Sequence, residues 1–351
     1  MRIAQIAPLY EAMPPKLYGG TERIVSFLTE ELVAMGHDVT LFASGDSVTS
    51  ATLAPMRNTA IRLDPSVKDP IALHYRMVEQ IYRRKDDFDV LHSHIDFFPL
   101  SLFSRQNVPF VTTLHGRLDI AEFIEIFSTF REAPFVSISD NQRAPVPHLN
   151  WARTVLHGIP ANLLTPRPVK QEYAAFLGRI CPEKRADRAI RIAGRAGMKL
   201  KIAAKVDNAD KEYYDSQIKP LIRNNPDVEF IGEINDRQKP EFLSGAHTLL
   251  FPIDWPEPFG LVMIEAMACG TPVIAYRAGS VPEVIDDGVS GFIVADEDEA
   301  VAAARRVHTL DRAKVRATFD RRWTARRMAE EYVSLYEELA HPMRRLRVVN
   351  G

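Results

Sequence analysis

The chain has 351 residues, more than most single domains, and its 46% hydrophobic and 26% charged residues are ordinary for a soluble globular protein. Its 44 Lys and Arg against 46 Asp and Glu leave a net charge of -2, which excludes the overall positive field that recruits nucleic acid. Two cysteines are too few for a disulfide framework, the opening residues lack the features of a secretory signal, and no apolar stretch reaches the ~18 residues of a membrane span, so we expect a cytoplasmic protein of two domains.

Short apolar runs alternate with helical patterns along the chain, which is typical of α/β proteins with parallel sheets. A first series predicts strands at residues 2–8, 38–43, 89–94, 109–115, 134–139 and 153–158. A second series predicts strands at residues 173–178, 200–205, 228–233, 248–253, 272–277 and 291–294. Segments such as 184–197 and 209–223 are long enough for helices between them.

The proline-rich segment 159–171 lies between the two series and is expected to be a linker, because prolines restrict the backbone and remove hydrogen-bond donors. We therefore place the domain boundary near residue 165. Two parallel sheets in tandem imply a cleft between them, and open α/β sheets bind ligands at the carboxyl ends of their strands. The chemistry is expected in loops that follow strands.

The segment EPFGLVMIEAMACGTPVIA, residues 257–275, places one carboxylate before an apolar run and a second inside it. The run predicts a helix of about three turns that Gly270 ends. Apolar neighbours surround Glu265 on this helix, so its carboxylate is expected to be buried and to need a partner. One alternative is a structural role for Glu265, paired with a core arginine.

A sugar nucleotide would satisfy this segment. Glu265 lies roughly 7 to 8 Å along the helix axis from Gly260, about the reach of a diphosphate with a sugar at either end. The amides of Phe259, Gly260 and Leu261 at the helix start are expected to hold the phosphates. Glu265 would then accept hydrogen bonds from one sugar diol, and Glu257 from the other sugar.

This segment resembles the Glu-x7-Glu signature of retaining glycosyltransferases with the GT-B fold, and its form is similar to glycosyltransferase family 4. Three other stretches resemble that family in the same order: YGGTERIV (18–25), FLGRICPEK (176–184) and AGSVPEVIDDGVSGFIV (278–294). The resemblance covers both halves of the chain. It implies two Rossmann-like domains that face a cleft, with a C-terminal helix that returns to the N-terminal domain.

The domain limits follow from the boundary and the resemblance together. Residues 1–165 are expected to form the acceptor-side domain and residues 166–320 the domain that binds the nucleotide sugar. Residues 321–351 are expected to carry the returning helix, within 322–340. The basic side chains between Arg305 and Arg347 leave open a peripheral contact with anionic lipid at the inner face of a membrane, although solvated helix faces are the alternative that we favour.

Four residues are expected to be catalytic. Arg179 follows a strand and Lys184 comes shortly after it, and two cations at a cleft edge would neutralise a leaving diphosphate without a metal; the alternative for Arg179 is a surface ion pair with Glu183. The resemblance assigns the same role to both cations, a sugar-hydroxyl contact to Glu257, and a contact with the donor sugar to His115. A lone histidine is otherwise more often structural.

Further contacts are expected at the edges of the site. By resemblance, the loop of Gly19 and Gly20 contacts donor phosphate or acceptor, although both glycines also suit ordinary loop punctuation. Lys205 stands where family members often have glycine, and would contact the donor or face solvent. Ile234 lies where family backbone atoms read the base. The acceptor is expected to contact three residues of the N-terminal half: Tyr10, Lys16 and Tyr18.

Competing motifs are weaker. HSHID, residues 92–96, has the order of some metal ligands but lacks a following histidine, so its side chains are expected to border the cleft instead. Asp87 and Asp89 precede their strand and therefore fall at the wrong end of the sheet for a metal site. No Gly-x-Gly-x-x-Gly or Walker loop occurs, which excludes the usual dehydrogenases and ATPases.

The sequence thus predicts a hexosyltransferase that moves a sugar from a nucleotide diphosphate sugar to a carbohydrate, lipid-linked or small-molecule acceptor with retention. UDP-glucose is preferred over GDP-mannose as donor, and no metal or other cofactor is expected. The alternatives are a hydrolase that uses Glu257 and Glu265 as an acid pair, an epimerase on the same fold, and a non-catalytic sensor of nucleotide sugars.

Overall fold

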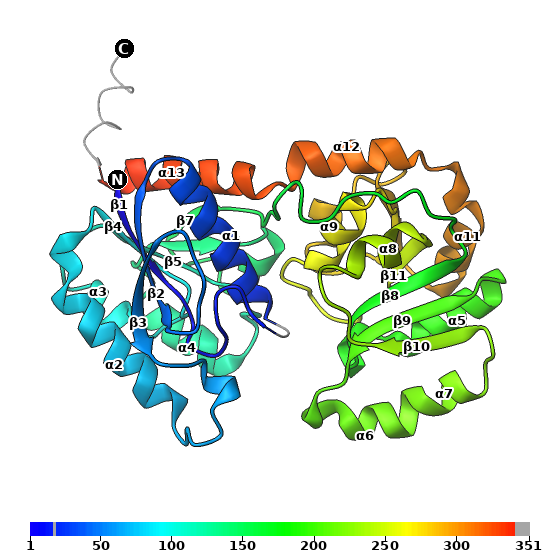
Figure 1. Ribbon diagram of the computed structural model, residues 1–351, viewed down its shortest axis with the longest axis horizontal. Helices are drawn as coiled ribbons and strands as arrows, with labels where there is room; N and C mark the ends of the chain where they lie inside the picture. Colours follow the sequence, from blue (N-terminus) through cyan, green and yellow to red (C-terminus); the bar gives the residue numbers. More distant parts are fainter. Residues whose placement is uncertain (17–18, 341–351) are drawn as a thin grey trace, which may run out of the picture. The chain divides into compact units, whose positions relative to one another are not determined.

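The computed structural model describes residues 1–16 and 19–340, and it divides into two compact units (Figure 1). The first unit joins Met1–Gly158 to the C-terminal segment that begins at Ala325, and the second unit is Ile159–Thr324. The chain therefore changes unit a few residues from the limits expected near 165 and 321. The C-terminal helix belongs to the first unit, as the resemblance implied.

The first unit is built on a parallel sheet of seven strands in the order β3-β2-β1-β4-β5-β6-β7. Its strands are β1 Arg2–Ile6, β2 Asp38–Ser44, β3 Thr52–Arg57, β4 Val90–Ser93, β5 Phe110–Thr113, β6 Phe135–Ser137 and β7 Trp151–Thr154. Six of them were expected. The sequence analysis missed β3, which lies at the edge of the sheet and contains Pro55. An edge strand tolerates proline because one side of its backbone needs no partner strand.

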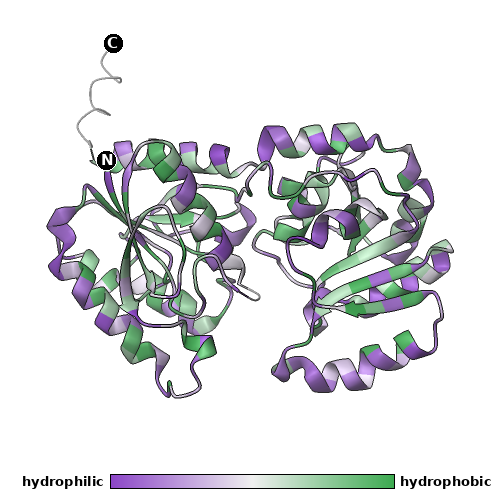
Figure 2. Ribbon diagram, viewed as in Figure 1, coloured by the Kyte–Doolittle hydropathy of each residue, from purple (hydrophilic) through white to green (hydrophobic). Residues whose placement is uncertain are grey.

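Helices cover both faces of this sheet. They are α1 Gly20–Ala34, α2 Pro70–Arg83, α3 Leu100–Phe103, α4 Ala121–Thr129 and α13 Ala325–Ala340. The carboxylate of Asp69 caps α2 by accepting from the amides of Ile71 and Ala72. Buried side chains of α2 and α3 pack on one face of the sheet, whereas α1 packs beside α13 over the other. In Figure 2 these helices carry hydrophobic and hydrophilic residues on different sides.

The second unit has a parallel sheet of six strands in the order β10-β9-β8-β11-β12-β13. Its strands are β8 Tyr173–Arg179, β9 Leu200–Lys205, β10 Val228–Gly232, β11 Ala246–Phe251, β12 Val273–Tyr276 and β13 Gly291–Val294. All six were expected from the apolar runs. The runs identify these strands well because central parallel strands are buried on both faces and read as continuous hydrophobic segments.

Helices also cover both faces of the second sheet. They are α5 Ala186–Ala196, α6 Lys211–Tyr213, α7 Lys219–Arg223, α8 Lys239–Ser244, α9 Leu261–Ala268, α10 Val281–Val284, α11 Glu297–Arg306 and α12 Arg312–Arg322, with one π-helical turn at Tyr214–Ile218. Helices α5 and α11 pack together over one face, and α9 and α12 over the other. No described helix has the length and apolar character that a membrane crossing needs.

The strand order fixes where each unit is open to a ligand. In the first sheet the chain winds outward in one direction from β1 and in the other from β4, and in the second sheet the same reversal falls between β8 and β11. Loops that follow the two strands of such a pair diverge and leave a crevice at the carboxyl ends. The loops after β1, β4, β8 and β11 are therefore the places to search.

Candidate functional site

In the second unit, the loops that follow β8 and β11 meet. The amide of Asp254 donates to the carbonyl oxygen of Glu183 at 2.8 Å. Beside this contact the ammonium group of Lys184 bonds to the carboxylate of Glu257, and the ring nitrogen of Trp255 donates to the same carboxylate oxygen at 3.0 Å. The fold thus joins two of the residues that were expected to be catalytic, from positions 73 residues apart in the sequence.

Glycines make this junction tight. Gly260 precedes α9 with φ of +80°, a conformation that other residues adopt only with strain. A Cβ on Gly279 would lie 2.3 Å from backbone atoms of Glu257, so only glycine fits there. The amide of Ser280 donates to the carbonyl oxygen of Glu257 at 2.9 Å. The stretch that begins at Ala278 therefore holds the backbone of Glu257 in place. The sequence analysis did not predict this contact between the two motifs.

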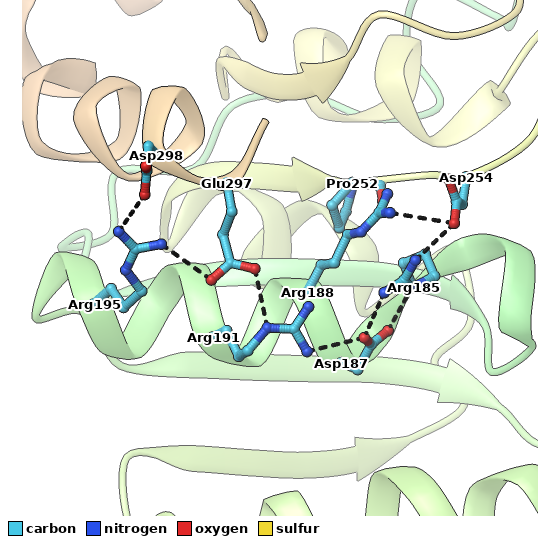
Figure 3. Close-up of polar contacts among 9 residues, drawn as sticks. All are labelled: Arg185, Asp187, Arg188, Arg191, Arg195, Pro252, Asp254, Glu297 and Asp298. Atoms are coloured by element: carbon cyan, nitrogen blue, oxygen red, sulfur yellow. Dashed lines mark hydrogen bonds and ion pairs between the residues drawn. The ribbon is translucent and has the colours of Figure 1, made fainter. Parts of the chain in front are cut away.

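A row of ion pairs anchors the same loops to α5 (Figure 3). Arg185 stands just before α5 with φ of +56°, and its guanidinium group bonds to Asp187 at 2.9 Å and to Asp254 at 2.6 Å. Arg188 reaches the same Asp254 carboxylate at 3.2 Å. One turn further along, Arg191 bonds to both Asp187 and Glu297 at 3.0 Å. The row ties the loops that carry Lys184 and Glu257 to the helix between them.

The other two expected cations lie among acids. Arg179 ends β8, and its guanidinium group is 3.4 Å from Glu183, 3.7 Å from Asp207 and 3.6 Å from Asp210. The ion pair with Glu183 that was the alternative for Arg179 is therefore present. Lys205 ends β9 and pairs with Asp207 at 2.8 Å. Ile234 follows β10 and is half-buried.

Glu265 is buried on α9, and its partner is a lysine and not the arginine that was the structural alternative. Its carboxylate lies 2.7 Å from the ammonium group of Lys239, at the start of α8, and Lys239 is also 3.3 Å from Asp236. Both Glu265 and Lys239 are less than a tenth exposed. The helix begins at Leu261 with Gly260 as its N-cap, so of the three amides expected to hold phosphate, that of Leu261 belongs to the first helical residue and those of Phe259 and Gly260 directly precede the helix.

In the first unit, a cavity of about 230 Å³ opens between the loops that follow β1 and β4. Its described lining includes Tyr10 and His115, which were both expected in the site. Lys16 is exposed and pairs with Asp46 at 3.0 Å, away from this lining. Tyr18 lies outside the described residues. The described lining consists of Pro8, Tyr10, Thr21, Glu22, His74, His94, Ile95, Asp96, Phe98, His115 and Gly116.

The glycine before α1 allows close approach to an acid that the sequence analysis did not single out. Gly20 begins α1, and Gly19 precedes it in an extended conformation. A Cβ on Gly19 would lie 2.9 Å from a carboxylate oxygen of Glu22. Glu22 is only 7% exposed, and burial raises its pKa, while a hydrogen bond from its own amide opposes that rise.

Asp96 is the second acid of this cavity and belongs to the HSHID motif. It adopts φ of +50°, and burial raises its pKa to about 6. The histidines of the same motif form hydrogen bonds with other side chains of the first unit. His92 reaches Thr113 at 2.7 Å and His94 reaches His115 at 2.9 Å, so both rings are hydrogen-bonded to protein. His94, Ile95 and Asp96 belong to the described lining of the cavity, whereas His92 does not.

The hydrogen bonds of His94 fix the protonation of His115. The side-chain oxygen of Gln5 can only accept, so His94 donates to it from Nε2 at 2.9 Å. His94 Nδ1 therefore accepts, and His115 donates to it from Nε2. Burial lowers the pKa of His115 to about 3. At neutral pH His115 is an uncharged ring whose Nδ1 is a buried acceptor without a hydrogen-bond partner among the described residues.

The C-terminal helix supports these histidines from behind. The hydroxyl of Tyr336 accepts from Gln5 at 3.1 Å and lies 2.6 Å from Nδ1 of His92. Tyr332 contacts Thr113 at 2.9 Å. Both tyrosines are fully buried, and burial raises the pKa of each phenol. The helix thus contributes to the environment of the cavity as well as to the core.

The Asp-x-Asp pattern was expected at the amino end of the first sheet, and this prediction is confirmed. Asp87 ends a short 3-10 turn, and Asp89 precedes β4. The carboxylate of Asp89 accepts from the backbone and side chain of Arg2 at the start of β1. Neither acid lines the cavity.

Two family models match the chain. The model described as Glycosyltransferase Family 4 matches residues 18–181, and the model described as Glycosyl transferases group 1 matches residues 165–322. The two models overlap at residues 165–181, shortly after the chain enters the second unit. Together they include every strand of the second sheet and the residues of both candidate sites except Pro8 and Tyr10.

Curated relatives and solved structures match over nearly the full length. Phosphatidyl-myo-inositol mannosyltransferase of Mycobacterium leprae is 27% identical, with 97% of each chain covered. Glycogen synthase of Mycobacterium tuberculosis is 24% identical, with 99% of this chain and 98% of the relative covered. Two solved structures share the fold: AviGT4 (23% identity, TM-score 0.72, 97% and 98% covered) and Anabaena HepE with UDP and glucose (17%, 0.73, 96% and 100%).

Proposed function

The chain belongs to glycosyltransferase family 4 and has the GT-B fold, and we propose that it transfers a hexose from a nucleotide diphosphate sugar with retention at the anomeric carbon. The donor is UDP-glucose in preference to GDP-mannose, and the reaction needs no metal. The single observation that carries this proposal is the junction of Lys184 and Glu257 at the β8/β11 crevice.

The chemistry follows from that junction. Lys184, Arg179 and the amides at the start of α9 are available to stabilise charge on a leaving diphosphate, and stabilisation of this kind commonly contributes most to catalysis. The bond between the anomeric carbon and the phosphate oxygen breaks, and a bond to the acceptor oxygen forms on the same face. The leaving phosphate takes the proton of the acceptor hydroxyl. Glu257 holds hydroxyls of the transferred sugar, and Glu265 holds the ribose.

Three of the donor contacts require ion pairs to exchange. Lys184 now bonds to Glu257, Arg179 to three acids, and Glu265 to Lys239. A diphosphate would bring negative charge to Lys184 and Arg179, and the sugars would bring hydroxyl donors to Glu257 and Glu265. Lys239 would keep its ion pair with Asp236 at 3.3 Å. Lys239 adds a cation beside the ribose contact that the sequence analysis did not anticipate.

The donor preference has modest support. HepE structures are described with UDP, with UDP and glucose, and with UDP-glucose, whereas the mycobacterial relative is named a mannosyltransferase. A thermal-shift screen of nucleotide sugars would decide, because a ligand that binds the native state raises the unfolding temperature. We expect the largest rise with UDP-glucose.

Rates of donor consumption, measured with and without acceptors, distinguish a transferase from a hydrolase, an epimerase and a sensor. Transfer that exceeds donor hydrolysis is expected, and it should persist after EDTA treatment. Hydrolysis as fast as transfer would favour a hydrolase that uses Glu257 and Glu265, and interconversion of the donor would favour an epimerase. Donor binding without turnover on any acceptor would indicate a sensor.

A membrane-bound acceptor is a weaker proposal. Some described side chains of the basic segment pair with acids on their own helices, Arg316 with Asp320 and Arg326 with Glu330. Arg344, Arg345 and Arg347 lie outside the described residues. Pairs four residues apart are typical of solvated helix faces. Co-sedimentation with vesicles that contain anionic lipid would test the contact, and we expect little binding.

A further inference from the structure

The described lining of the first unit's cavity contains acidic residues but no cationic ones. Among its described lining residues there is no Lys or Arg, whereas two acids, Glu22 and Asp96, belong to the lining. Burial is the cause of the raised pKa of Asp96, and no cation in the described part of the lining offsets that effect. Glu22 is buried and Asp96 is partly buried, so both carboxylates are costly to keep ionised unless hydrogen-bond donors of a ligand reach them.

One cation outside the described lining acts on the cavity. Arg62 opposes the rise in the pKa of Glu22 and of Tyr10 that burial causes. Its guanidinium group bonds at 2.8 Å to Glu11, whose side chain is fully buried. Glu11 therefore uses the charge of Arg62, which leaves the cavity with a net acidic lining.

Aromatic rings complete the wall. The rings of Tyr10 and His74 lie 5.0 Å apart, and His74 stacks on Phe98 at 5.1 Å. Both nitrogens of His74 are occupied, because Nε2 accepts from the amide of Leu9 and Nδ1 lies 2.7 Å from the carbonyl oxygen of Pro70. His74 thus offers the cavity a ring face and no charge. Burial lowers the pKa of His74, which favours the neutral ring. Apolar ring faces with a few fixed polar groups are typical of small-ligand sites.

We propose that this cavity seats an uncharged, hydroxyl-rich ring of the acceptor, a sugar or a polyol, and that Glu22 and Asp96 exclude a phosphorylated ring. The proposal rests on the proposed function, because it names the class of acceptor. Hydroxyl groups donate to both carboxylates, whereas a phosphate would face two like charges in a partly enclosed space. Specificity of this kind is set by repulsion of the wrong ligand as much as by attraction of the right one.

Matched acceptor pairs test the proposal. Glucose and glucose 6-phosphate, mannose and mannose 6-phosphate, and myo-inositol and its 3-phosphate are each supplied with the donor that the thermal-shift screen selects. Initial rates of transfer are compared for the wild type, Glu22→Gln, Asp96→Asn and the double variant. The control is Glu122→Gln, which removes an exposed first-turn acid of α4 in the same unit, outside the cavity.

At least one uncharged acceptor should react at least about 10-fold faster than its phosphorylated counterpart, a difference that one repulsive contact supplies. The ratio of the rate with the uncharged acceptor to the rate with its phosphorylated counterpart should fall several-fold in the double variant. In the control variant this ratio should stay at the wild-type value. A faster phosphorylated acceptor, a ratio that the double variant leaves unchanged, or no reaction with any uncharged member would each overturn the proposal. If calorimetry shows that the wild type binds no nucleotide sugar, the proposed function fails; donor binding with transfer only to phosphorylated acceptors overturns this inference alone.

Discussion

Lys184 is the residue on which the proposed donor site depends most. Its ammonium nitrogen lies 5.1 Å from the centroid of the Trp255 ring and bonds to the carboxylate of Glu257. In the proposed reaction this cation would stabilise the charge that develops on the leaving diphosphate. Its pairing with Glu257 holds the side chain in place before a donor arrives.

Lys184→Ala should lower turnover by about 100-fold or more, because removal of one transition-state donor typically has that effect. The fold should persist, as circular dichroism would show. Lys219→Ala is the matched control: it removes a partly exposed lysine of the same unit that pairs with Asp215, and should change turnover little. Near-normal turnover of Lys184→Ala would remove Lys184 from the mechanism.

The ionised carboxylate of Asp96 destabilises the folded protein at neutral pH. Its folded pKa of about 6 lies above the ordinary value of 3.8, so at neutral pH the folded state holds an ionised group at a cost. Asp96→Asn should therefore stabilise the protein at pH 7.5 by about 1–3 kcal/mol, since asparagine also tolerates a positive φ. The gain should shrink as pH falls through about 6 and vanish below the ordinary value of 3.8, where both states of the wild type are protonated.

Urea unfolding of both proteins across this pH range measures the effect of Asp96→Asn. A variant less stable than the wild type at pH 7.5, or a difference in stability that does not depend on pH, would show that the carboxylate is not strained by burial.

Helices α8 and α9 are linked by a buried ion pair. Lys239 and Glu265 lie 2.7 Å apart, and their side chains are 10% and 4% exposed. Removal of one partner leaves an uncompensated charge, whereas replacement of both by apolar groups is often neutral. The pair therefore acts as a unit in stability.

Lys239→Met should destabilise the protein by about 3–5 kcal/mol, and Lys239→Met with Glu265→Leu should recover most of that loss. Lys219→Met is the control, because its more exposed pair should contribute less than about 1 kcal/mol. Urea midpoints of the four proteins give the comparison. A double variant as unstable as the single one would mean that the ion pair is not the cause.

The elements themselves were largely predictable from the sequence. Apolar runs located twelve of the described strands, most of them central parallel strands that are buried on both faces. The strand that was missed, β3, lies at a sheet edge and contains Pro55. The pairing of Glu265 was not predictable, because Lys239 comes from another helix and meets Glu265 only in the folded structure. Glu22 was not predicted as a site residue, because an acid in the first turn of a helix is common in any sequence. Its place in the cavity lining depends on tertiary contacts.

At the scale of the whole molecule, each unit carries one site at its own reversal of strand order. The second unit supplies cations, helix amides and two acids suited to a sugar nucleotide. The first unit supplies an acidic, aromatic cavity suited to hydroxyl groups. Family resemblance predicted the candidate sugar-nucleotide site from ordered motifs, whereas the character of the cavity follows only from side chains that the fold brings together.

Retention in a transfer reaction tests this account most directly. With an α-configured donor such as UDP-glucose and an uncharged acceptor, the product that forms first should carry an α linkage in proton NMR spectra, and UDP should appear in equal amount. A β-linked product, or release of free glucose with UDP at a rate equal to any transfer, would contradict the proposed function.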